Sequence, residues 1–307
     1  MSATLKHHTK PSVAVIVLAW NSSDCIVRCL TSLQTSTYPI NVYVIDNAST
    51  DNTKDVVRRF KKVAYRNSGS NLGYAGGNNV GLAIAQEHGY DYAFLVNPDA
   101  YVAPDCIQKL VAAMESDSSI GLASPKIYYA DLNTIWFAGA SLDPKTGLSP
   151  HIGQGEPDGP AYDQDQEVPR ANGCALLVRM PALQRVGMLD ERYFLYFEEI
   201  DWSLRFAKAG YRNFYVASAH AWHAASSSTG GYYTPLYQYY TTRNGLLCMR
   251  EHSTASWWAF ICRHLVSSGQ RMYRTLRNRP RNFVKVTRAI GKGYVDFTRK
   301  RFGMQKI

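Results

Sequence analysis

The sequence lacks any pair of cysteines at a redox or metal-binding spacing. Its six cysteines form no Cys-x-x-Cys pair and no zinc-ligand pattern. Reduced and mostly packed thiols are therefore the expected state, which favours the cytosolic side of the cell.

The chain also lacks a long apolar run. Met1 to Pro11 is polar and basic, so no signal peptide is expected. The uncharged span from Asn213 to Thr242 is long enough to cross a bilayer, but it is rich in Ser, Gly, His and Tyr. That composition is not typical of a transmembrane helix.

Acidic residues are scarce in the last part of the chain. The 307 residues include 34 Lys plus Arg and 24 Asp plus Glu, a net charge of +10. From Arg243 to Ile307 there are 15 basic and 2 acidic residues, a net charge of +13, whereas Met1 to Thr242 has 19 and 22, a net charge of −3. Such a tail suits nucleic acid, an acidic partner or the anionic face of a membrane.

No P-loop and no Gly-x-Gly-x-x-Gly fingerprint is present. Residues 67–81 instead form a segment rich in Gly and Asn, with five glycines. Glycine permits positive φ and close approach of the backbone to a ligand. We interpret this segment as a loop that either approaches a ligand or serves only the structure.

Strand-like and helix-like stretches alternate along the first 220 residues. Apolar runs predict strands at 13–20, 42–46, 92–96, 120–124, 175–178 and 214–219, and residues at helical spacing lie between several of them. The alternation predicts an α/β fold, with a mostly parallel central sheet flanked by helices on both faces. The pattern loosens over 126–169, which we interpret as a long loop or lid.

Asp99 follows the predicted strand at 92–96, in the sequence Asn-Pro-Asp. It should lie just beyond the carboxyl end of that strand, the edge where open α/β sheets bind ligands. A divalent cation or a plain surface turn would both suit these residues. His220 and His223 follow the last predicted strand, and a His beside an Asp at one sheet edge makes a divalent-metal site.

Three acids, Glu198, Glu199 and Asp201, lie at the start of a predicted helix. Acids in a first helical turn are stabilised by the helix dipole, which requires no chemistry. These acids also follow four aromatics and a leucine, which would line a pocket and desolvate a carboxylate. A catalytic role for at least one of them is the functional hypothesis.

The C-terminal region combines aromatic and basic residues. Trp257, Trp258 and Phe260 precede residues 271–301, which hold 11 basic residues and one acid. This combination is typical of a segment lying on an anionic bilayer surface. A solvated basic helix packed on the domain is the alternative.

Eight stretches, taken in order, resemble family 2 glycosyltransferases and within them the rhamnosyltransferase-like branch. They lie at 15–21, 44–51, 71–79, 97–99, 172–179, 197–205, 222–230 and 239–244. The resemblance implies inverting, sugar-nucleotide-dependent enzymes with the GT-A fold. The resemblance covers about 13–244 and implies a GT-A domain over 1–245. The composition of 246–307 predicts a basic, aromatic-containing helical extension associated with a membrane surface.

The resemblance also implies roles for individual residues. Those expected to bind the nucleotide sugar are Trp20, Asn21, Asp46, Asn71, Gly73, Asn78 and Arg243, with Asp46 on the nucleobase and Arg243 on the diphosphate. Asp99 and His223 would hold Mg²⁺ or Mn²⁺. Asn97 stands where many members carry the first acid of an Asp-x-Asp motif, so this stretch would supply one carboxylate.

Catalysis by inversion requires a base that takes the proton of the acceptor hydroxyl. The resemblance makes Glu199 that base, with Glu198 as the alternative. It implies an acceptor and sugar pocket formed by Asn172, Gly173, Asp201 and Trp202.

The implied reaction moves a sugar, L-rhamnose from dTDP-rhamnose, to a hydroxyl of a cell-surface glycan or its lipid-linked precursor. The donor is a dTDP- or UDP-sugar, and the expected location is the inner face of the cell membrane. Two alternatives stay open. A nucleotidyltransferase would carry a Gly-rich Arg-Lys loop after the first strand, which residues 19–24 lack. A nucleic-acid binder would use the tail, although the tail has no nucleic-acid motif.

Overall fold

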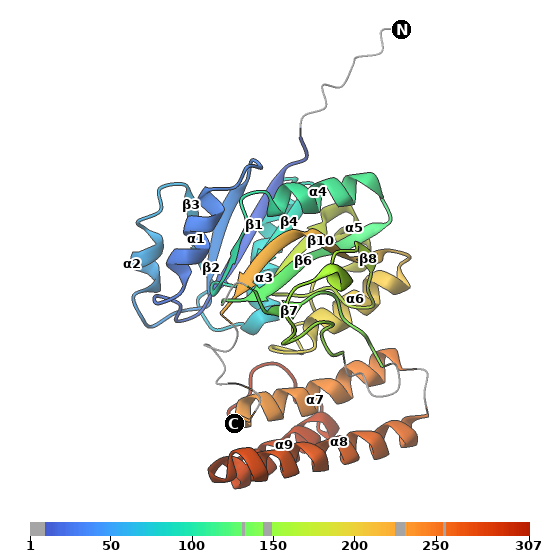
Figure 1. The fold of residues 1–307 in the computed structure, drawn as a ribbon. Coiled ribbons are helices and arrows are strands. Elements are labelled where there is room, and N and C mark those ends of the chain that lie inside the picture. The colour runs from blue at the N-terminus through green and yellow to red at the C-terminus, as the bar shows by residue number, and fades with distance from the viewer. Residues whose placement is uncertain (1–9, 131–132, 144–148, 225–230, 232, 254–255) are drawn as a thin grey trace, which may run out of the picture.

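The computed structural model describes residues 10–130, 133–143, 149–224, 231, 233–253 and 256–307. This part of the chain forms an α/β body and, beneath it, a layer of three helices (Figure 1). The strands are β1 (Val13–Ala19), β2 (Asn41–Asp46), β3 (Val63–Asn67), β4 (Tyr92–Val96), β5 (Ala100–Val102), β6 (Ile120–Tyr129), β7 (Ile135–Phe137), β8 (Gln166–Glu167), β9 (Ala175–Arg179) and β10 (Arg212–His223). The helices are α1 (Ile26–Gln34), α2 (Thr53–Val57), α3 (Gly73–Glu87), α4 (Cys106–Ser116), α5 (Met180–Val186), α6 (Glu198–Lys208), α7 (Pro235–His252), α8 (Trp257–Asn278) and α9 (Phe283–Thr298).

The strands form one mostly parallel sheet, as predicted. Its order is β3-β2-β1-β4-β9-β6-β10-β5, with β7 paired to β6 and β8 to β10. β9 runs antiparallel between β4 and β6, and β5 runs antiparallel to β10. The carboxyl ends of β1, β2, β3, β4, β6 and β10 therefore lie at one edge. The interpretation of 126–169 as a loop is wrong in part, because β7 and β8 extend the sheet there.

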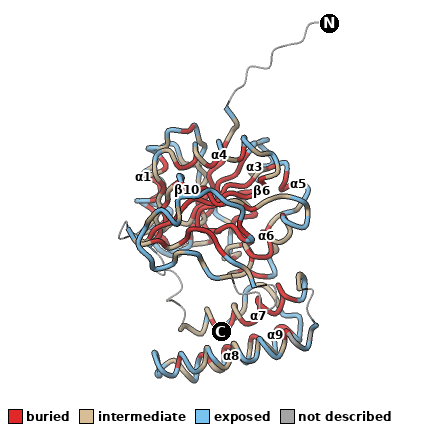
Figure 2. Tube along the Cα trace, turned by 45° about the vertical axis from the view of Figure 1, so that its right-hand side comes forward, coloured by how far each residue is buried: buried red, intermediate tan, exposed pale blue. Residues whose placement is uncertain are grey.

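Alternating apolar side chains along the strands build a core on each face of the sheet. Along β1, Val15 and Val17 join a cluster with residues of α1, α2 and α4, while Ile16 joins one with residues of α3, α5 and α6. Successive side chains of a strand point to opposite faces, so one run of apolar residues serves both layers. Figure 2 shows the buried residues concentrated in the strands.

The glycine-rich segment is helical from Gly73 onward, so its interpretation as a loop up to residue 81 is wrong. Within α3, a Cβ added at Gly77 would lie 2.3 Å from Leu18 Cδ1, and one at Gly81 2.4 Å from Ile16 Cγ2. These glycines allow close packing of α3 on β1. Close contact with the sheet, rather than with a ligand, explains why glycine occupies positions 77 and 81.

The C-terminal helices share a core with the α/β body. Leu246 and Leu247 of α7, Phe260 of α8 and Phe297 of α9 cluster with Ile200 of α6. The predicted division between residues 245 and 246 falls inside α7 and marks no structural boundary. Among the helices that the structure describes, none is long and apolar enough to cross a membrane.

Candidate active site

The carboxyl edge of the sheet gathers residues from distant parts of the sequence. Asp46 ends β2 beside Ala19, the last residue of β1, and His223 ends β10 beside Ala100. Asp99 directly precedes that alanine. Asp46, Asp99 and His223 therefore lie along one edge of the sheet.

Asp99 and His223 are in direct contact. His223 Nε2 lies 3.1 Å from Asp99 Oδ1, and both side chains are less than 10% exposed. Burial lowers the pKa of His223, but the nearby Cys174 sulfur and Asp99 raise it to about 10. Burial also raises the pKa of the Cys174 thiol, against the opposing effect of His223.

The donor set suits an open divalent-metal site if the cation displaces the proton that His223 holds at its raised pKa. A carboxylate and an imidazole are ligands for Mn²⁺, and a carboxylate alone suits Mg²⁺. The second ring nitrogen of His223, Nδ1, is buried and finds no hydrogen-bond partner in the described part of the chain. No group of three metal-binding side chains occurs among the described residues, so a cation here would need ligands from the substrate or from water.

Glu198 and Glu199 begin α6 in different environments. Glu198 is buried, and its Oε2 has no partner in the part of the chain that the structure describes. Burial, and then the neighbouring Glu199, raise the pKa of Glu198 well above its usual value. Glu199 is 23% exposed and lies 3.5 Å from an Arg170 guanidinium nitrogen. Burial thus favours the neutral form of Glu198, while solvent reaches Glu199.

Arg170 is a buried cation on the path into β9. It donates to Ser149 Oγ at 2.7 Å and to Ser149 O at 3.1 Å, which leaves its remaining nitrogen toward Glu199. The Tyr74 hydroxyl donates to Gly173 O at 2.5 Å, and a Cβ at Gly173 would lie 3.6 Å from Glu199 Cβ. Gly173 and Tyr74 therefore lie beside Glu199.

On the β2 side, Asp46 is buried and hydrogen-bonded. Its Oδ2 accepts from the Tyr65 hydroxyl at 2.5 Å and its Oδ1 from Ser49 N at 2.9 Å. Asn21 has a left-handed backbone, with φ of 48°, and its Oδ1 accepts from Thr50 N at 2.8 Å. These bonds fix the turns after β1 and β2.

The sequence matches the family described as Glycosyl transferase family 2 over residues 14–183. The chain belongs to glycosyltransferase family 2. That match spans β1 to α5 and includes Asp46 and Asp99. The chain is therefore a glycosyltransferase and not a nucleotidyltransferase.

Two curated relatives place the glycosyltransferase in the rhamnosyltransferase-like branch. It is 32% identical over 239 residues to an N-acetylglucosaminyl-diphospho-decaprenol L-rhamnosyltransferase of Mycobacterium tuberculosis (strain ATCC 25618 / H37Rv), covering 70% of this chain and 77% of that protein. It is 24% identical over 237 residues to rhamnosyltransferase WbbL of Escherichia coli (strain K12), covering 74% and 89%.

Solved structures share the GT-A fold. The mannosyltransferase PcManGT from Pyrobaculum calidifontis, in complex with GDP-Man and Mn²⁺, superposes with a TM-score of 0.59 at 15% identity. The match covers 96% of this chain and 89% of that one. The predicted fold is confirmed.

Several predicted site residues of the glycosyltransferase serve its structure instead. Arg243 is fully buried in α7, where its guanidinium donates to main-chain carbonyls, so it does not face the sheet edge as a diphosphate clamp would. Asp201 pairs with Arg205 at 2.8 Å and His252 at 2.7 Å. Trp202 is buried in the core and donates to a main-chain carbonyl. Neither Asp201 nor Trp202 offers a polar group to an acceptor.

Three of the predicted amides also have internal partners. Asn78 lies inside α3, 1% exposed, and donates to Tyr74 O at 3.0 Å. Asn71 accepts from Gly73 N at 2.9 Å, just before that helix. Asn172 accepts from Cys174 N at 2.9 Å. Asn71 remains at the edge as a half-buried group, whereas Asn78 does not.

Sequence reasoning missed Arg170, Tyr74 and Tyr65. Each reaches its partner from a segment far away in the sequence, so no local spacing marks it. The only signal was the position of Arg170, two residues before the stretch at 172–179. Residues 225–230 of the stretch at 222–230 lie outside the described residues.

Proposed function

We propose that this glycosyltransferase transfers L-rhamnose from dTDP-rhamnose to a hydroxyl of a lipid-linked glycan, with inversion at the anomeric carbon. Two observations carry the proposal. Asp99 and His223 are in contact at the carboxyl edge of the sheet, and Glu199 lies beside Gly173, whose neighbour Cys174 acts on His223. The name of the relative that is 32% identical supplies the sugar and the diphosphate-lipid class of acceptor.

Glu199 is the group we assign as general base. It accepts the proton of the acceptor hydroxyl as that oxygen bonds to the anomeric carbon and the bond to the diphosphate breaks. A base must be ionised and accessible. Solvent reaches Glu199, and the Arg170 guanidinium lies 3.5 Å from its carboxyl group. Glu198 meets neither condition, since it is buried with a raised pKa.

Asp99 and His223 are the residues that would hold a divalent cation, Mg²⁺ or Mn²⁺. Such a cation would offset the charge that grows on the departing dTDP. The role of this chain is to orient the two ligands: β4 and β10 bring them within 3.1 Å of each other. The contact between His223 Nε2 and Asp99 Oδ1 supports this assignment. A metal-dependent transfer assay distinguishes Mg²⁺ from Mn²⁺.

The nucleotide side of the site belongs to the turns after β1 and β2. Trp20 is 45% exposed at the end of β1, so its ring is open to stack on a planar base or to cover a ribose. Asp46 keeps acceptor capacity beyond its bonds to Tyr65 and Ser49, because a carboxylate has about four acceptor positions. We assign it to an N–H group of the base.

We further propose that α8 rests on an anionic membrane surface. Val266 and Tyr273 are 62% and 64% exposed on it, and Trp258, Leu265 and Leu276 are exposed with them. They recur at helical spacing and so form one apolar strip. Arg263, Arg274 and Arg277 are exposed on the same helix and have no ion-pair partner among the described residues. An apolar strip beside unpaired cations suits an interfacial helix.

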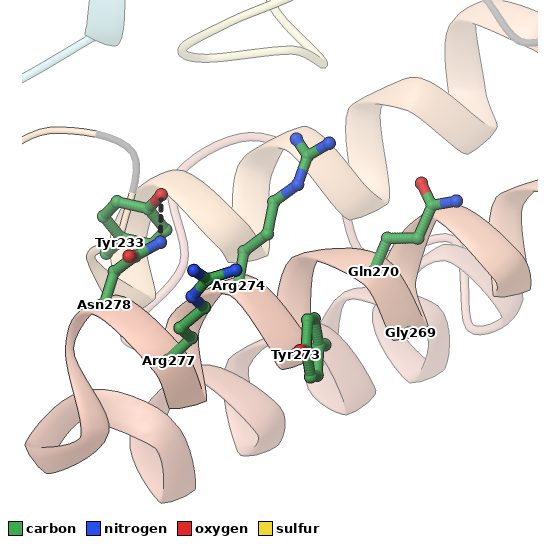
Figure 3. Close-up of a pocket in the computed structure, with 7 residues that line it drawn as sticks. All are labelled: Tyr233, Gly269, Gln270, Tyr273, Arg274, Arg277 and Asn278. Carbon is green, nitrogen blue, oxygen red and sulfur yellow. Dashed lines mark hydrogen bonds between the residues drawn. The ribbon is translucent and has the colours of Figure 1, made fainter.

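A hollow of about 800 Å³ adjoins this strip (Figure 3). Gln270, Arg274 and Arg277 project into it from α8, and Asn278 donates to the Tyr233 hydroxyl at 3.0 Å at one end. Guanidinium groups bind phosphate oxygens by charge-assisted hydrogen bonds. We assign this hollow to phosphate groups of the membrane surface.

The direct test is a transfer assay with dTDP-rhamnose and a short-chain prenyl-diphosphate N-acetylglucosamine, with Mg²⁺, Mn²⁺ or EDTA. We expect a rhamnosylated product of inverted configuration only in the presence of metal. UDP-sugars and GDP-mannose serve as competing donors. Transfer from one of these in place of dTDP-rhamnose would refute the donor, and product with EDTA would refute the metal.

A further inference from the structure

The turn that leads into α6 has a strained backbone. Phe194, Tyr196 and Phe197 have φ values of 64°, 67° and 76°. The left-handed conformation costs an ordinary residue roughly 1–2 kcal/mol. Three such residues directly before Glu198 therefore require surroundings that impose the conformation, and strain of this kind clusters at functional sites.

Asn244 of α7 supplies part of those surroundings. Its Nδ2 lies 2.8 Å from the carbonyl oxygens of Tyr193, Leu195 and Tyr196. An amide has two hydrogens, so three acceptors at this distance share them. Asn244 is fully buried, and both of its amide hydrogens are directed to this turn.

Arg243 holds the same turn from the next position. Its Nη2 donates to Arg192 O at 3.0 Å and Tyr193 O at 2.9 Å, and its Nη1 to Gly303 O at 2.7 Å. Its Nε donates to Asn244 Oδ1 at 2.9 Å, which orients the amide. Gly303 N also donates to Arg192 O at 2.9 Å. The turn is thereby tied to the segment that follows α9.

The opposite side of the turn touches α3. Phe194 O accepts from Tyr74 N at 2.6 Å, and a Cβ at Gly73 would lie 2.2 Å from that oxygen. The Phe194 ring stacks on Tyr240 of α7 at 5.4 Å between centroids. The turn is thus held between the start of α3 and the helical layer.

We propose that Asn244 and Arg243 are positioning residues for catalysis: they hold the turn at 193–197, with its left-handed Phe194, Tyr196 and Phe197, in the conformation that places Glu199 at the sheet edge. This inference rests on the proposed role of Glu199 as base. It gives the C-terminal helices a function in the reaction, because α7 carries both residues. It also gives the Arg-Asn pair at 243–244 a role in place of diphosphate binding.

The test compares Asn244→Ala with Thr242→Val. Thr242 is a matched control: it is buried in the same helix, and its hydroxyl bonds Gln238 and Arg271 instead of the turn. We expect Asn244→Ala to lower kcat about 100-fold, the effect of a base displaced by about 1 Å, with KM for the donor unchanged. Hydrogen exchange over 192–198 should accelerate in this variant only. Thr242→Val should lose thermal stability while keeping kcat.

Equal kcat in Asn244→Ala and Thr242→Val, with no faster exchange at 192–198, would overturn the inference. If Asn244→Ala does not fold, Arg243→Lys takes its place, since one ammonium keeps the charge but cannot reach three carbonyls at once. A folded Arg243→Lys with unchanged kcat would also overturn it. The exchange measurement needs no substrate, so a wild-type protein that transfers no sugar would refute the proposed function and not the bracing of the turn.

Discussion

The Arg170 guanidinium lies 3.5 Å from Glu199 Oε1, and the arginine is 3% exposed where the glutamate is 23% exposed. A buried cation thus faces an accessible carboxylate. We expect Arg170→Met to lower kcat at least about tenfold, because Glu199 loses the buried cation that faces it. Arg170→Lys should recover part of the loss. Steady-state kinetics with both variants check this, and an unchanged kcat in Arg170→Met would mean that the pair is only structural.

The two adjacent glutamates make a matched pair of variants. Glu199→Gln should reduce transfer by about 10²–10⁴-fold, the contribution of a general base, while binding of dTDP stays near wild type. Glu198→Gln should keep most activity, because glutamine resembles the neutral acid. Transfer rates and nucleotide binding measured side by side decide the assignment. The reverse ranking would make Glu198 the base.

The raised pKa of Glu198 predicts a pH-dependent stability. Its folded pKa lies well above the unfolded value of about 4.3, so the folded state binds more protons between the two. Stability from this group is full below the unfolded pKa and is lost as pH rises toward the folded pKa. Glutamine does not titrate, so Glu198→Gln does not lose this stability as the pH rises. The difference in melting temperature, variant minus wild type, should therefore increase with pH above 5. A difference that does not change with pH would contradict the burial of a neutral acid.

The Asp99–His223 pair predicts metal binding that depends on the nucleotide. With two ligands from the described chain, Mn²⁺ alone should raise the melting temperature little, whereas Mn²⁺ with dTDP should stabilise by about 2.7 kcal/mol at 100 times Kd. Asp99→Asn and His223→Ala should each abolish this stabilisation by Mn²⁺ with dTDP. His220→Ala, another histidine of β10, is the control and should keep it. Loss in all three variants would point to general damage to β10.

The exposed face of α8 predicts a charge-dependent association with membranes. Each basic residue near an anionic surface contributes about 1 kcal/mol, so the double reversal Arg274→Glu with Arg277→Glu should lower partitioning at least about tenfold. Arg59→Glu, an exposed reversal on the α/β body, should change it less. Sedimentation with phosphatidylglycerol vesicles, against phosphatidylcholine vesicles, measures both. Equal partitioning of all forms would refute the interfacial role of α8.

Local patterns were sufficient for much of the fold. The apolar run before Asp99 and the Val and Ile runs at 13–20 and 42–46 predicted strands, because a buried strand requires continuous apolar residues. Polar residues at the ends of those runs predicted the sheet edge. The glycines at 73–81 were misjudged, because the same lack of side chain serves a ligand or a packed helix, and sequence spacing does not distinguish the two.

By itself, the sequence determined the alternation of strands and helices, the family, and the pair of acids at 198 and 199, since these depend on neighbours along the chain. Only the tertiary structure decided that burial favours the neutral form of Glu198 and that Arg170 faces Glu199. It also decided that the guanidinium of Arg243 points to main-chain carbonyls. Burial and charge pairing arise between segments far apart in sequence: Arg170 reaches Glu199, and Asn244 reaches the turn at 193–197. The packing of α7 against that turn directs the guanidinium of Arg243 to main-chain carbonyls instead of a phosphate.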